Sequence, residues 1–215
     1  MPTLLLRLEG PMQSWGTRSR FDDRDTGLEP SKSGVIGLLG AALGRPRSAS
    51  VDDLATLKMG VRVDRAGIVA YDFQTAQRVV RASGAGTEDA TSRRYYLSDA
   101  AFLVGLEGDE TLLREAHGAL LNPFWPLSLG RKSYLPSRPV YLPDGLRPES
   151  LPEALAAYPP LSGGKPPKTV RYVLESATGA MRQDQPAGPF AERAFVMRYV
   201  ETVQAPWGEV PHVSV

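Results

Sequence analysis

The first regular element of the chain is indicated by a short apolar run. Residues 3–8 carry four leucines and are followed by Glu9-Gly10-Pro11, residues that interrupt regular structure. We therefore expect a buried first strand at residues 3–8. Apolar positions at 61–64 and 100–106 predict two further strands, and residues 68–73 either continue the sheet or begin a hairpin.

Two later segments have the spacing of amphipathic helices. The first follows Pro30, where Ser31 or Ser33 can serve as the N-cap, and it ends at Gly44 and Pro46. Its apolar positions form one broad face. The second helix is expected at residues 110–121, where leucine and alanine recur at helical intervals. These two helices separate the predicted strands.

The order of the predicted elements indicates the fold class. A short strand at residues 139–142 completes the order strand, helix, strand, strand, helix, strand, which is the ferredoxin-like βαββαβ pattern. The segment 74–92 is polar and has glycine and serine at its centre, so it predicts a long flexible protrusion. We place an inserted hairpin at about residues 74–97.

The C-terminal third is less regular in its pattern. Strands are expected at residues 169–175 and 194–200, but apolar and polar positions alternate poorly there. We predict an α+β chain with a ferredoxin-like domain at residues 1–143. Residues 144–215 should form a small C-terminal β appendage.

Composition excludes several kinds of function. The 215 residues include no cysteine, which excludes disulfides, thiolate catalysis and iron–sulfur clusters. The two histidines, His117 and His212, lie far apart, and no group of carboxylates has the spacing of a calcium loop. We therefore expect no metal and no cofactor. No apolar stretch approaches the roughly 20 residues of a membrane span, so no membrane partner is expected.

Charge is unevenly distributed along the chain. The net charge is only +1, which is low for a protein that binds free nucleic acid through bulk charge. Residues 116–143 and 154–174 contain no acid, and the first of these segments carries Arg131 and Lys132 in a glycine-containing loop. Such a distribution fits a local cationic groove, and it equally fits a solvated surface with patches of charge.

The start of the first helix carries two features of interest. Lys32 and Ser33 lie where free backbone N–H groups and the helix dipole favour an anion, although simple capping explains them as well. Gly34, Gly37 and Gly40 follow at steps of three, and each costs about 1 kcal/mol relative to alanine. The glycines predict the close approach of either a sugar–phosphate chain or the neighbouring sheet.

Aromatic residues beside arginines add a third candidate. Trp15 stands in a glycine-bounded loop, where it can stack on a nucleobase or fill the end of the core. Arg93-Arg94-Tyr95-Tyr96 lies where the protrusion returns, a combination that suits single-stranded RNA. Because side chains alternate along a strand, only one Arg–Tyr set can lie on the binding face.

These segments together resemble a known family. Gly10-Pro11-Met12-Gln13-Ser14-Trp15-Gly16 and the segment 30–44 are similar to the N-terminal signature of the CasD family. The segments 95–102 and 129–133 follow in the family's order. The resemblance covers residues 3–142.

The resemblance implies a fold, a function and a set of partners. CasD is the 5′-end subunit of the type I-E CRISPR complex Cascade, and it belongs to the RAMP superfamily of ferredoxin-like RNA binders. It implies a palm with a thumb hairpin, a non-catalytic protein that grips the 5′ handle of the crRNA, and contacts with the Cascade backbone and large subunits. Such a cytoplasmic protein would cap the complex in antiviral defence and would meet target DNA only indirectly. The candidate handle contacts are Gln13, Trp15, Lys32, Ser33, Gly34, Arg93, Arg94, Arg131 and Lys132.

Two alternatives remain at this point. A related RAMP branch cleaves precursor crRNA without metal, a reaction that usually requires converging His, Lys and Tyr side chains. Here Lys132 and Tyr134 have no histidine near them in the sequence. The other alternative is a ferredoxin-like protein-interaction module that has no role in RNA binding.

Overall fold

The described residues of the chain fold into two β-sheets and four helices. The computed structural model describes residues 1–17, 22–163 and 165–212. The strands are β1 (Thr3–Glu9), β2 (Met12–Gln13), β3 (Asp23–Arg24), β4 (Lys58–Arg65), β5 (Ile68–Val80), β6 (Thr87–Ser98), β7 (Ala101–Glu107), β8 (Leu146–Arg147), β9 (Thr169–Ser176), β10 (Ala180–Pro186) and β11 (Phe195–Pro206). The helices are α1 (Lys32–Ala42), α2 (Asp52–Ala55), α3 (Glu110–Leu121) and α4 (Leu151–Ala157).

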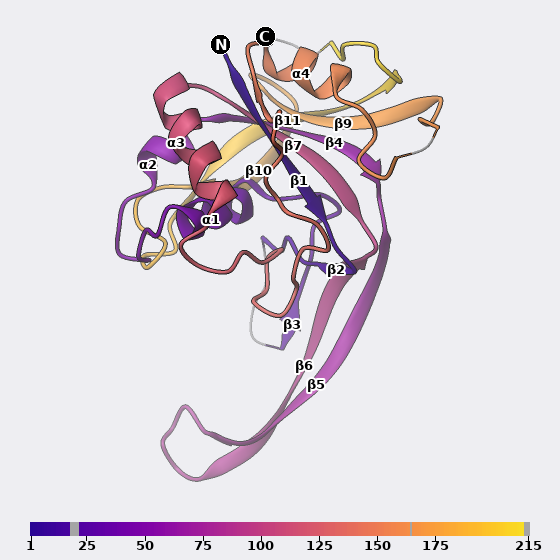
Figure 1. Cartoon of the computed structure of the whole chain (residues 1–215). Coiled ribbons are helices and arrows are strands. Elements are labelled where there is room, and N and C mark those ends of the chain that lie inside the picture. The colour runs from indigo at the N-terminus through magenta and orange to yellow at the C-terminus, as the bar shows by residue number, and fades with distance from the viewer. Residues whose placement is uncertain (18–21, 164, 213–215) are drawn as a thin grey trace.

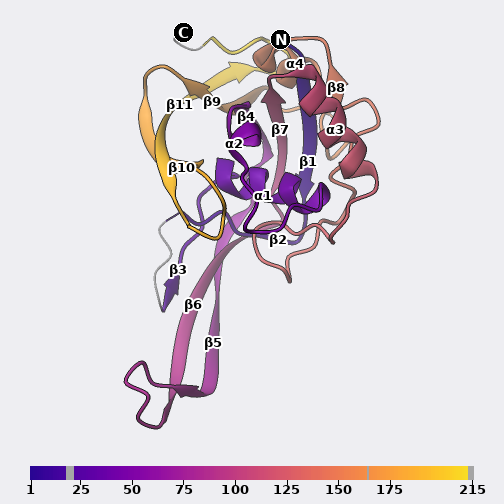
Figure 2. The ribbon, with the colours of Figure 1, turned by 90° about the vertical axis from the view of Figure 1, so that its left-hand side faces the viewer.

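The larger sheet forms the body of the molecule. Its seven strands lie in the order β10-β11-β9-β4-β7-β1-β8. Leu4, Leu6 and Leu8 of β1 pack in the cluster that contains the apolar residues of α1 and α3, whereas Leu5 packs with α4. Side chains of a strand alternate between the two faces of a sheet, so helices on both faces require an apolar run rather than an alternating pattern. Figure 2 shows α1, α2 and α3 on one face of this sheet.

Several predicted elements are confirmed. The mixed α and β composition is present, and α3 has the predicted bounds of residues 110–121. Helix α1 begins directly after Ser31, whose side chain accepts a hydrogen bond from the backbone N–H of Gly34. The short helix α2 was not predicted, because its four residues are too few to show a helical period.

The protrusion is a paired β-hairpin that extends away from the body (Figure 1). It begins at Ile68, six residues before the predicted start at residue 74. Strands β5 and β6 pair antiparallel from Ile68↔Ser98 to Val80↔Thr87, with an irregularity between Ala76 and Val79. Most of its side chains are exposed, which explains why its sequence is polar.

The strand predicted at residues 139–142 is absent. The segment lies beside β1, where Val140 accepts a hydrogen bond from the N–H of Arg7 at 3.0 Å, but it forms no strand. Pro139 and Pro143 have no N–H to donate to a ladder, which accounts for the irregular backbone. The edge position beside β1 is taken by the two residues of β8.

The C-terminal segment contains, besides the short β8, the two expected strands, as β9 and β11, and the unexpected strand β10. The strands β9, β10 and β11 belong to the larger sheet, because β9 pairs with β4 from Gly60↔Leu174 to Val63↔Arg171, β11 pairs with β9, and β10 pairs with β11. The boundary at residue 143 stays a prediction. Residues 164 and 213–215 of the predicted appendage lie outside the described part of the chain.

Candidate nucleic-acid interface

The N-terminus of α1, which was predicted to bind an anion, is occupied by a carboxylate of the chain itself. Asp184 of β10 accepts a hydrogen bond from the N–H of Lys32 at 2.9 Å, and Ser31 accepts the N–H of Gly34 at 3.3 Å. Asp184 is 1% exposed and also forms an ion pair with Arg198, with a shortest distance of 2.6 Å. The helix dipole therefore stabilises Asp184, and no phosphate is needed at this position.

Lys32 does not reach solvent, contrary to its predicted role as an RNA contact. Its side chain is 1% exposed, and its Nζ donates to Glu175 at 3.1 and 3.2 Å and to Gln185 at 3.0 Å. Burial lowers the pKa of Lys32, and the charge of Glu175 opposes that shift. The ammonium group thus joins α1 to β9 and β10.

Asp184 is kept ionised by its partners. Burial alone would raise the pKa of Asp184, but the hydrogen bonds and charge of Arg198 lower it below the usual value, with a contribution from the Lys32 N–H. Two cations, Lys32 and Arg198, and two anions, Asp184 and Glu175, thus form the network that joins α1 to the C-terminal strands. This network holds α1 on the sheet.

Gln13 and Trp15 are buried in the interior near the start of α1, so they are not exposed for RNA binding. Gln13 is fully buried and donates to the carbonyl groups of Leu8 and Ala100 at 3.1 and 2.8 Å. Trp15 is 1% exposed and donates its indole N–H to the side-chain oxygen of Gln13 at 3.1 Å. A methyl group built onto Gly34 would lie 2.8 Å from the Trp15 ring. For Trp15 and Gly34, the structure therefore favours the core-packing alternative.

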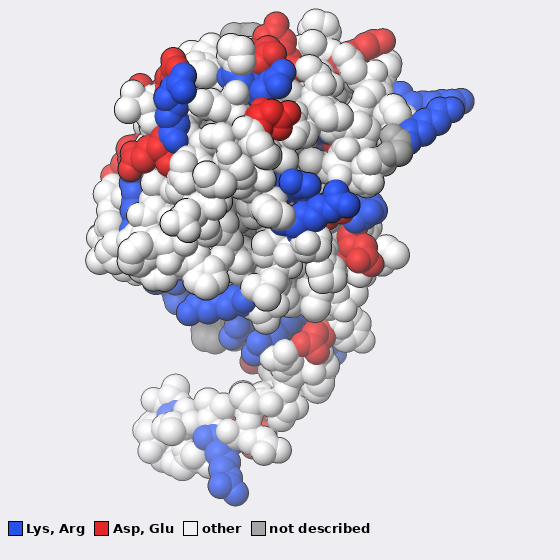
Figure 3. All heavy atoms as spheres, in the orientation of Figure 1, with Lys and Arg blue, Asp and Glu red and all other residues white. Residues whose placement is uncertain are grey.

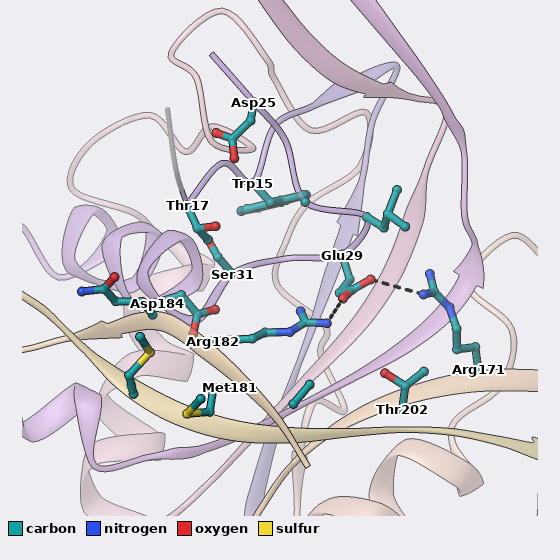
Figure 4. Close-up of a pocket in the computed structure, with 15 residues that line it drawn as sticks. Trp15, Thr17, Asp25, Glu29, Ser31, Arg171, Met181, Arg182, Asp184 and Thr202 are labelled. Carbon is teal, nitrogen blue, oxygen red and sulfur yellow. Dashed lines mark hydrogen bonds and ion pairs between the residues drawn. The ribbon is translucent and has the colours of Figure 1, made fainter. Parts of the chain in front are cut away.

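A cavity of about 720 Å³ opens beside Trp15 and the C-terminal strands (Figure 4). Glu29, which is 5% exposed, lies between Arg171 and Arg182 and forms an ion pair with each. Asp25 and Asp184 also line this cavity. Among the lining residues that the structure describes, both arginines are already paired with Glu29 and the charges are nearly balanced, so these residues offer no excess of positive charge to a polyanion.

A second groove, of about 790 Å³, runs along α1 from Ser33 to Ala41 and continues past the end of the helix to Arg47. It brings together the predicted residues Ser33, Gly34 and Lys132. Arg45 and Arg47 contribute two more cations, and none of the described residues that line the groove is acidic. Arg45 is paired with Asp53 at 2.6 Å, whereas Lys132 is exposed. The groove therefore has an excess of positive charge.

Two aromatic side chains line the same groove, and neither was predicted. Trp125 follows α3 and is 39% exposed, and Phe190 comes from the loop between β10 and β11. The main chain holds both in place, since Trp125 N–H donates to Ala41 at 3.2 Å and Ala191 N–H donates to Arg47 at 2.9 Å. The sequence could have indicated Trp125, because two adjacent aromatic residues between Pro123 and Pro126 are a recognisable pattern. It could not have indicated Phe190, because only the chain reversal in the fold brings that residue to the groove.

The loop of residues 128–135 connects this groove to the root of the hairpin. Arg131 donates to the Tyr134 hydroxyl at 2.8 Å and to the carbonyl of Arg24 at 3.2 Å. The Tyr134 ring lies 6.0 Å from that of Tyr96, and Arg24 pairs with Arg94 in the parallel ladder of β3 and β6. Arg94 and Tyr96 therefore lie on the hairpin face that meets the loop.

Arg93 lies on the other face of the hairpin. Its cross-strand neighbour is Phe73, and Tyr95 contacts Tyr71 at a ring-centroid distance of 5.8 Å. Tyr71 and Phe73 are 61% and 58% exposed. The structure thus separates the two Arg–Tyr sets, as the strand alternation predicts, and only the set with Arg94 is continuous with the loop that borders the groove.

The surface view agrees with this distribution of charge. Figure 3 shows Lys and Arg gathered along the lower side of the body, where the hairpin leaves it. Within the described residues, no group of three or more His, Asp or Glu side chains is placed to hold a metal ion. A search of the same residues finds no helix that is long and apolar enough to cross a membrane.

Comparison with known families identifies the chain. Residues 3–201 match the model of the family described as "CRISPR-associated protein (Cas_Cas5)". The chain belongs to this Cas5 family. A relative from Escherichia coli (strain K12), the "CRISPR system Cascade subunit CasD", is 33% identical to the Cas5 chain over 193 residues, which are 82% of this chain and 83% of that protein. The predicted resemblance to CasD is confirmed.

Solved structures support the same relationship for the fold of the Cas5 chain. One, named "Crystal structure of Cas protein", is 55% identical, has a TM-score of 0.84 and covers 98% of both chains. Another, named "CRISPR RNA-guided surveillance complex", is 31% identical, has a TM-score of 0.79 and covers 95% of this chain and 90% of that chain. Both likenesses extend over the body and the hairpin of this Cas5 chain, since almost the whole sequence is covered.

Proposed function

We propose that this Cas5-family chain is a CasD-like, non-catalytic subunit of a CRISPR Cascade complex, and that it holds the 5′ handle of the crRNA in the groove over α1. The names of the similar proteins support the assembly, because one is a Cascade subunit and another is an RNA-guided surveillance complex. The groove itself is the observation that supports an RNA-binding site on this chain. The described residues of its lining include Arg47, Lys132 and the Asp53-paired Arg45, and none of them is acidic.

Single-stranded RNA fits this combination of groups. Its phosphates are attracted by cations in a groove, and its unpaired bases stack on aromatic side chains. Only the phosphates that are contacted contribute to counterion release, so a protein with a net charge of +1 can bind RNA through one local cationic surface. The remaining faces are free to meet protein subunits.

We infer a path for the RNA from the groove to the hairpin. The path runs from Lys132 along the loop of residues 128–135 to Arg131 and then to Arg94. Ser33 contributes a hydroxyl at the start of α1. The hairpin of β5 and β6 would act as the thumb, and the strands β8-β1-β7-β4 with α1 and α3 would form a ferredoxin-like palm.

The proposed partners follow from membership in such a complex. The Cascade backbone and large subunits would meet the hairpin and the uncharged parts of the body, and target DNA would meet this chain only indirectly, since base pairing with the guide reads the target. A protein of this kind would work in the cytoplasm, where the guide RNA is made.

The arrangement of the candidate catalytic groups supports a non-catalytic role. Tyr134 is 6% exposed and its hydroxyl accepts a hydrogen bond from Arg131, so it is not presented to a 2′-hydroxyl. His117 lies on α3, where it hydrogen-bonds the Leu142 carbonyl at 2.8 Å and stacks on Tyr141. Lys132 therefore has neither tyrosine nor histidine beside it in position for general acid–base catalysis.

Binding of handle-length RNA from the CRISPR repeat, measured by titration over a range of salt concentrations, tests this proposal. Lys132→Ala and Arg94→Ala should each weaken binding and reduce the salt slope by about one contact. Arg93→Ala is the matched control, because it removes the same charge from the opposite face of β6 and should leave the slope unchanged. Equal effects of Arg93→Ala and Arg94→Ala would contradict the proposed path, and no binding by the unaltered chain would contradict the function.

A further inference from the structure

The groove over α1 contains a space that no side chain of residues 1–17, 22–163 or 165–212 fills. Two glycines of α1 and a third just after its end each have an aromatic ring near the position that a side chain would take. A methyl group built onto Gly34 would lie 2.8 Å from Trp15, one on Gly37 would lie 3.6 Å from Phe190, and one on Gly44 would lie 2.8 Å from Phe124.

Gly40 is different from these three glycines. A methyl group built there would have no atom of the surrounding structure within 4 Å, although Gly40 itself is largely shielded from solvent and lines the groove. The Phe190 ring lies over Gly37, one turn before Gly40, and the N–H of Trp125 donates to the carbonyl of Ala41, the residue after Gly40, at 3.2 Å. Both aromatic residues line the groove, so the space over Gly40 is a recess close to two aromatic side chains.

The charged groups near the recess indicate what could occupy it. Arg47 donates to the Phe190 carbonyl at 3.2 Å and thus stands at the Phe190 side, and Lys132 lies on the loop that borders the groove. In the part of the chain that the structure describes, no acidic residue lines the groove. An apolar side chain of a protein could fill the recess by shape but would leave these cations unpaired, whereas RNA supplies both a flat base for the recess and phosphates for the cations.

We propose that the recess over Gly40 binds one unpaired base of the RNA, stacked between Phe190 and Trp125. The inference rests on the proposed function, which places RNA in the same groove. A glycine below the base lets the ring approach the helix backbone, and stacking on aromatic faces needs no particular base edge. The recess would thus fix the position of one nucleotide without reading its sequence, while Arg47 and Lys132 hold the adjoining phosphates.

Fluorescence of 2-aminopurine tests the recess directly. Handle-length repeat RNAs that carry 2-aminopurine at each position in turn are titrated with the full chain. One position should show strong quenching on binding, because stacking on an aromatic ring quenches this base. Trp125→Ala should remove that quenching and weaken binding by roughly 5- to 150-fold, the range that corresponds to the loss of one stacked base. The salt slope should stay unchanged, because no phosphate contact is lost.

A second variant fills the recess without removing an aromatic ring. Gly40→Leu should block the base and weaken RNA binding to a similar extent, while the protein remains folded. Gly118→Leu in α3 is the matched control, because Gly118 is also a helical glycine with no atom within 4 Å of an added methyl group. It should gain helix propensity in the same way and bind RNA normally.

The outcomes separate the recess from the proposed function. If the unaltered chain binds RNA but Trp125→Ala and Gly40→Leu bind it equally well, the recess holds no base and the inference is wrong, while the proposed function stands. If these variants bind RNA normally but fail to enter the complex, a side chain of a protein partner fills the recess, which also overturns the inference. If the unaltered chain binds no handle RNA, both fail. If Gly40→Leu proves unstable, Trp125→Ala decides alone.

Discussion

Two glycines of the same helix should respond in opposite ways to the same substitution. Gly34 and Gly40 both lie in α1, and replacing either with alanine should raise intrinsic helix stability by about 1 kcal/mol. The tertiary surroundings differ. At Gly34 the new methyl group would lie 2.8 Å from Cε3 of Trp15 and 3.1 Å from the Ser31 hydroxyl, whereas at Gly40 it would touch nothing.

The magnitude follows from whether Trp15 can move. The ring is 1% exposed and is fixed by the hydrogen bond between its indole N–H and Gln13, so it has little room. Overpacking of this kind costs about 1–3 kcal/mol. Gly34→Ala should therefore be less stable than Gly40→Ala by about 1–3 kcal/mol. In a chain of this size, that difference corresponds to about 2–12 °C in Tm.

Thermal unfolding followed by circular dichroism measures this difference, and urea denaturation checks it at a single temperature. Gly40→Ala should melt at or above the Tm of the unaltered chain, and Gly34→Ala should melt below Gly40→Ala. Equal melting temperatures for the two variants would refute the assignment of Gly34 to the core. They would restore the alternative in which the whole row of glycines faces a ligand.

Three further predictions concern buried and candidate catalytic groups. Arg62→Ala should lower the free energy of unfolding by about 3–5 kcal/mol in urea denaturation, because it leaves the 2% exposed carboxylate of Asp64, the ion-pair partner of Arg62, without its cation. A loss below about 1 kcal/mol would contradict this. Asp184 has a pKa that is lower in the folded chain than in the unfolded chain, so its contribution to stability is complete above the unfolded pKa of about 3.9 and is lost as the pH falls through the folded value. The stability of Asp184→Asn should accordingly fall less steeply below about pH 4 than that of the unaltered chain, and identical slopes would disprove the link. His117→Ala should leave RNA affinity unchanged, and repeat RNA should stay intact in EDTA; discrete products would show that the chain is a nuclease.

Elements with a strong local pattern could be predicted from the sequence. Helix α3 has regular apolar spacing and an aspartate directly before it, and β1 is a leucine run that ends in glycine and proline. The strand expected at residues 139–142 failed because apolar residues between prolines do not ensure a ladder. The two residues of β8, which take that place at the sheet edge, are too few to leave a pattern.

The candidate site was only partly accessible from the sequence, because its residues come together through long-range contacts. Lys32 has the local setting of an anion site, but Glu175 and Asp184 come from strands more than 140 residues away and use its charge and its N–H. Phe190 reaches α1 only through the reversal between β10 and β11. By contrast, the alternation in β6 correctly indicated that Arg93 and Arg94 face opposite sides.

The position of the RNA on this chain tests the account most directly. Photo-crosslinking of the handle RNA in the assembled complex, followed by mass spectrometry of the crosslinked peptides, reports which side chains lie against it. The account predicts crosslinks at Trp125, Phe190 and Lys132, and along the loop toward Arg94. Crosslinks confined to Tyr71 and Phe73 on the outer face of the hairpin, with none in the groove, would contradict it.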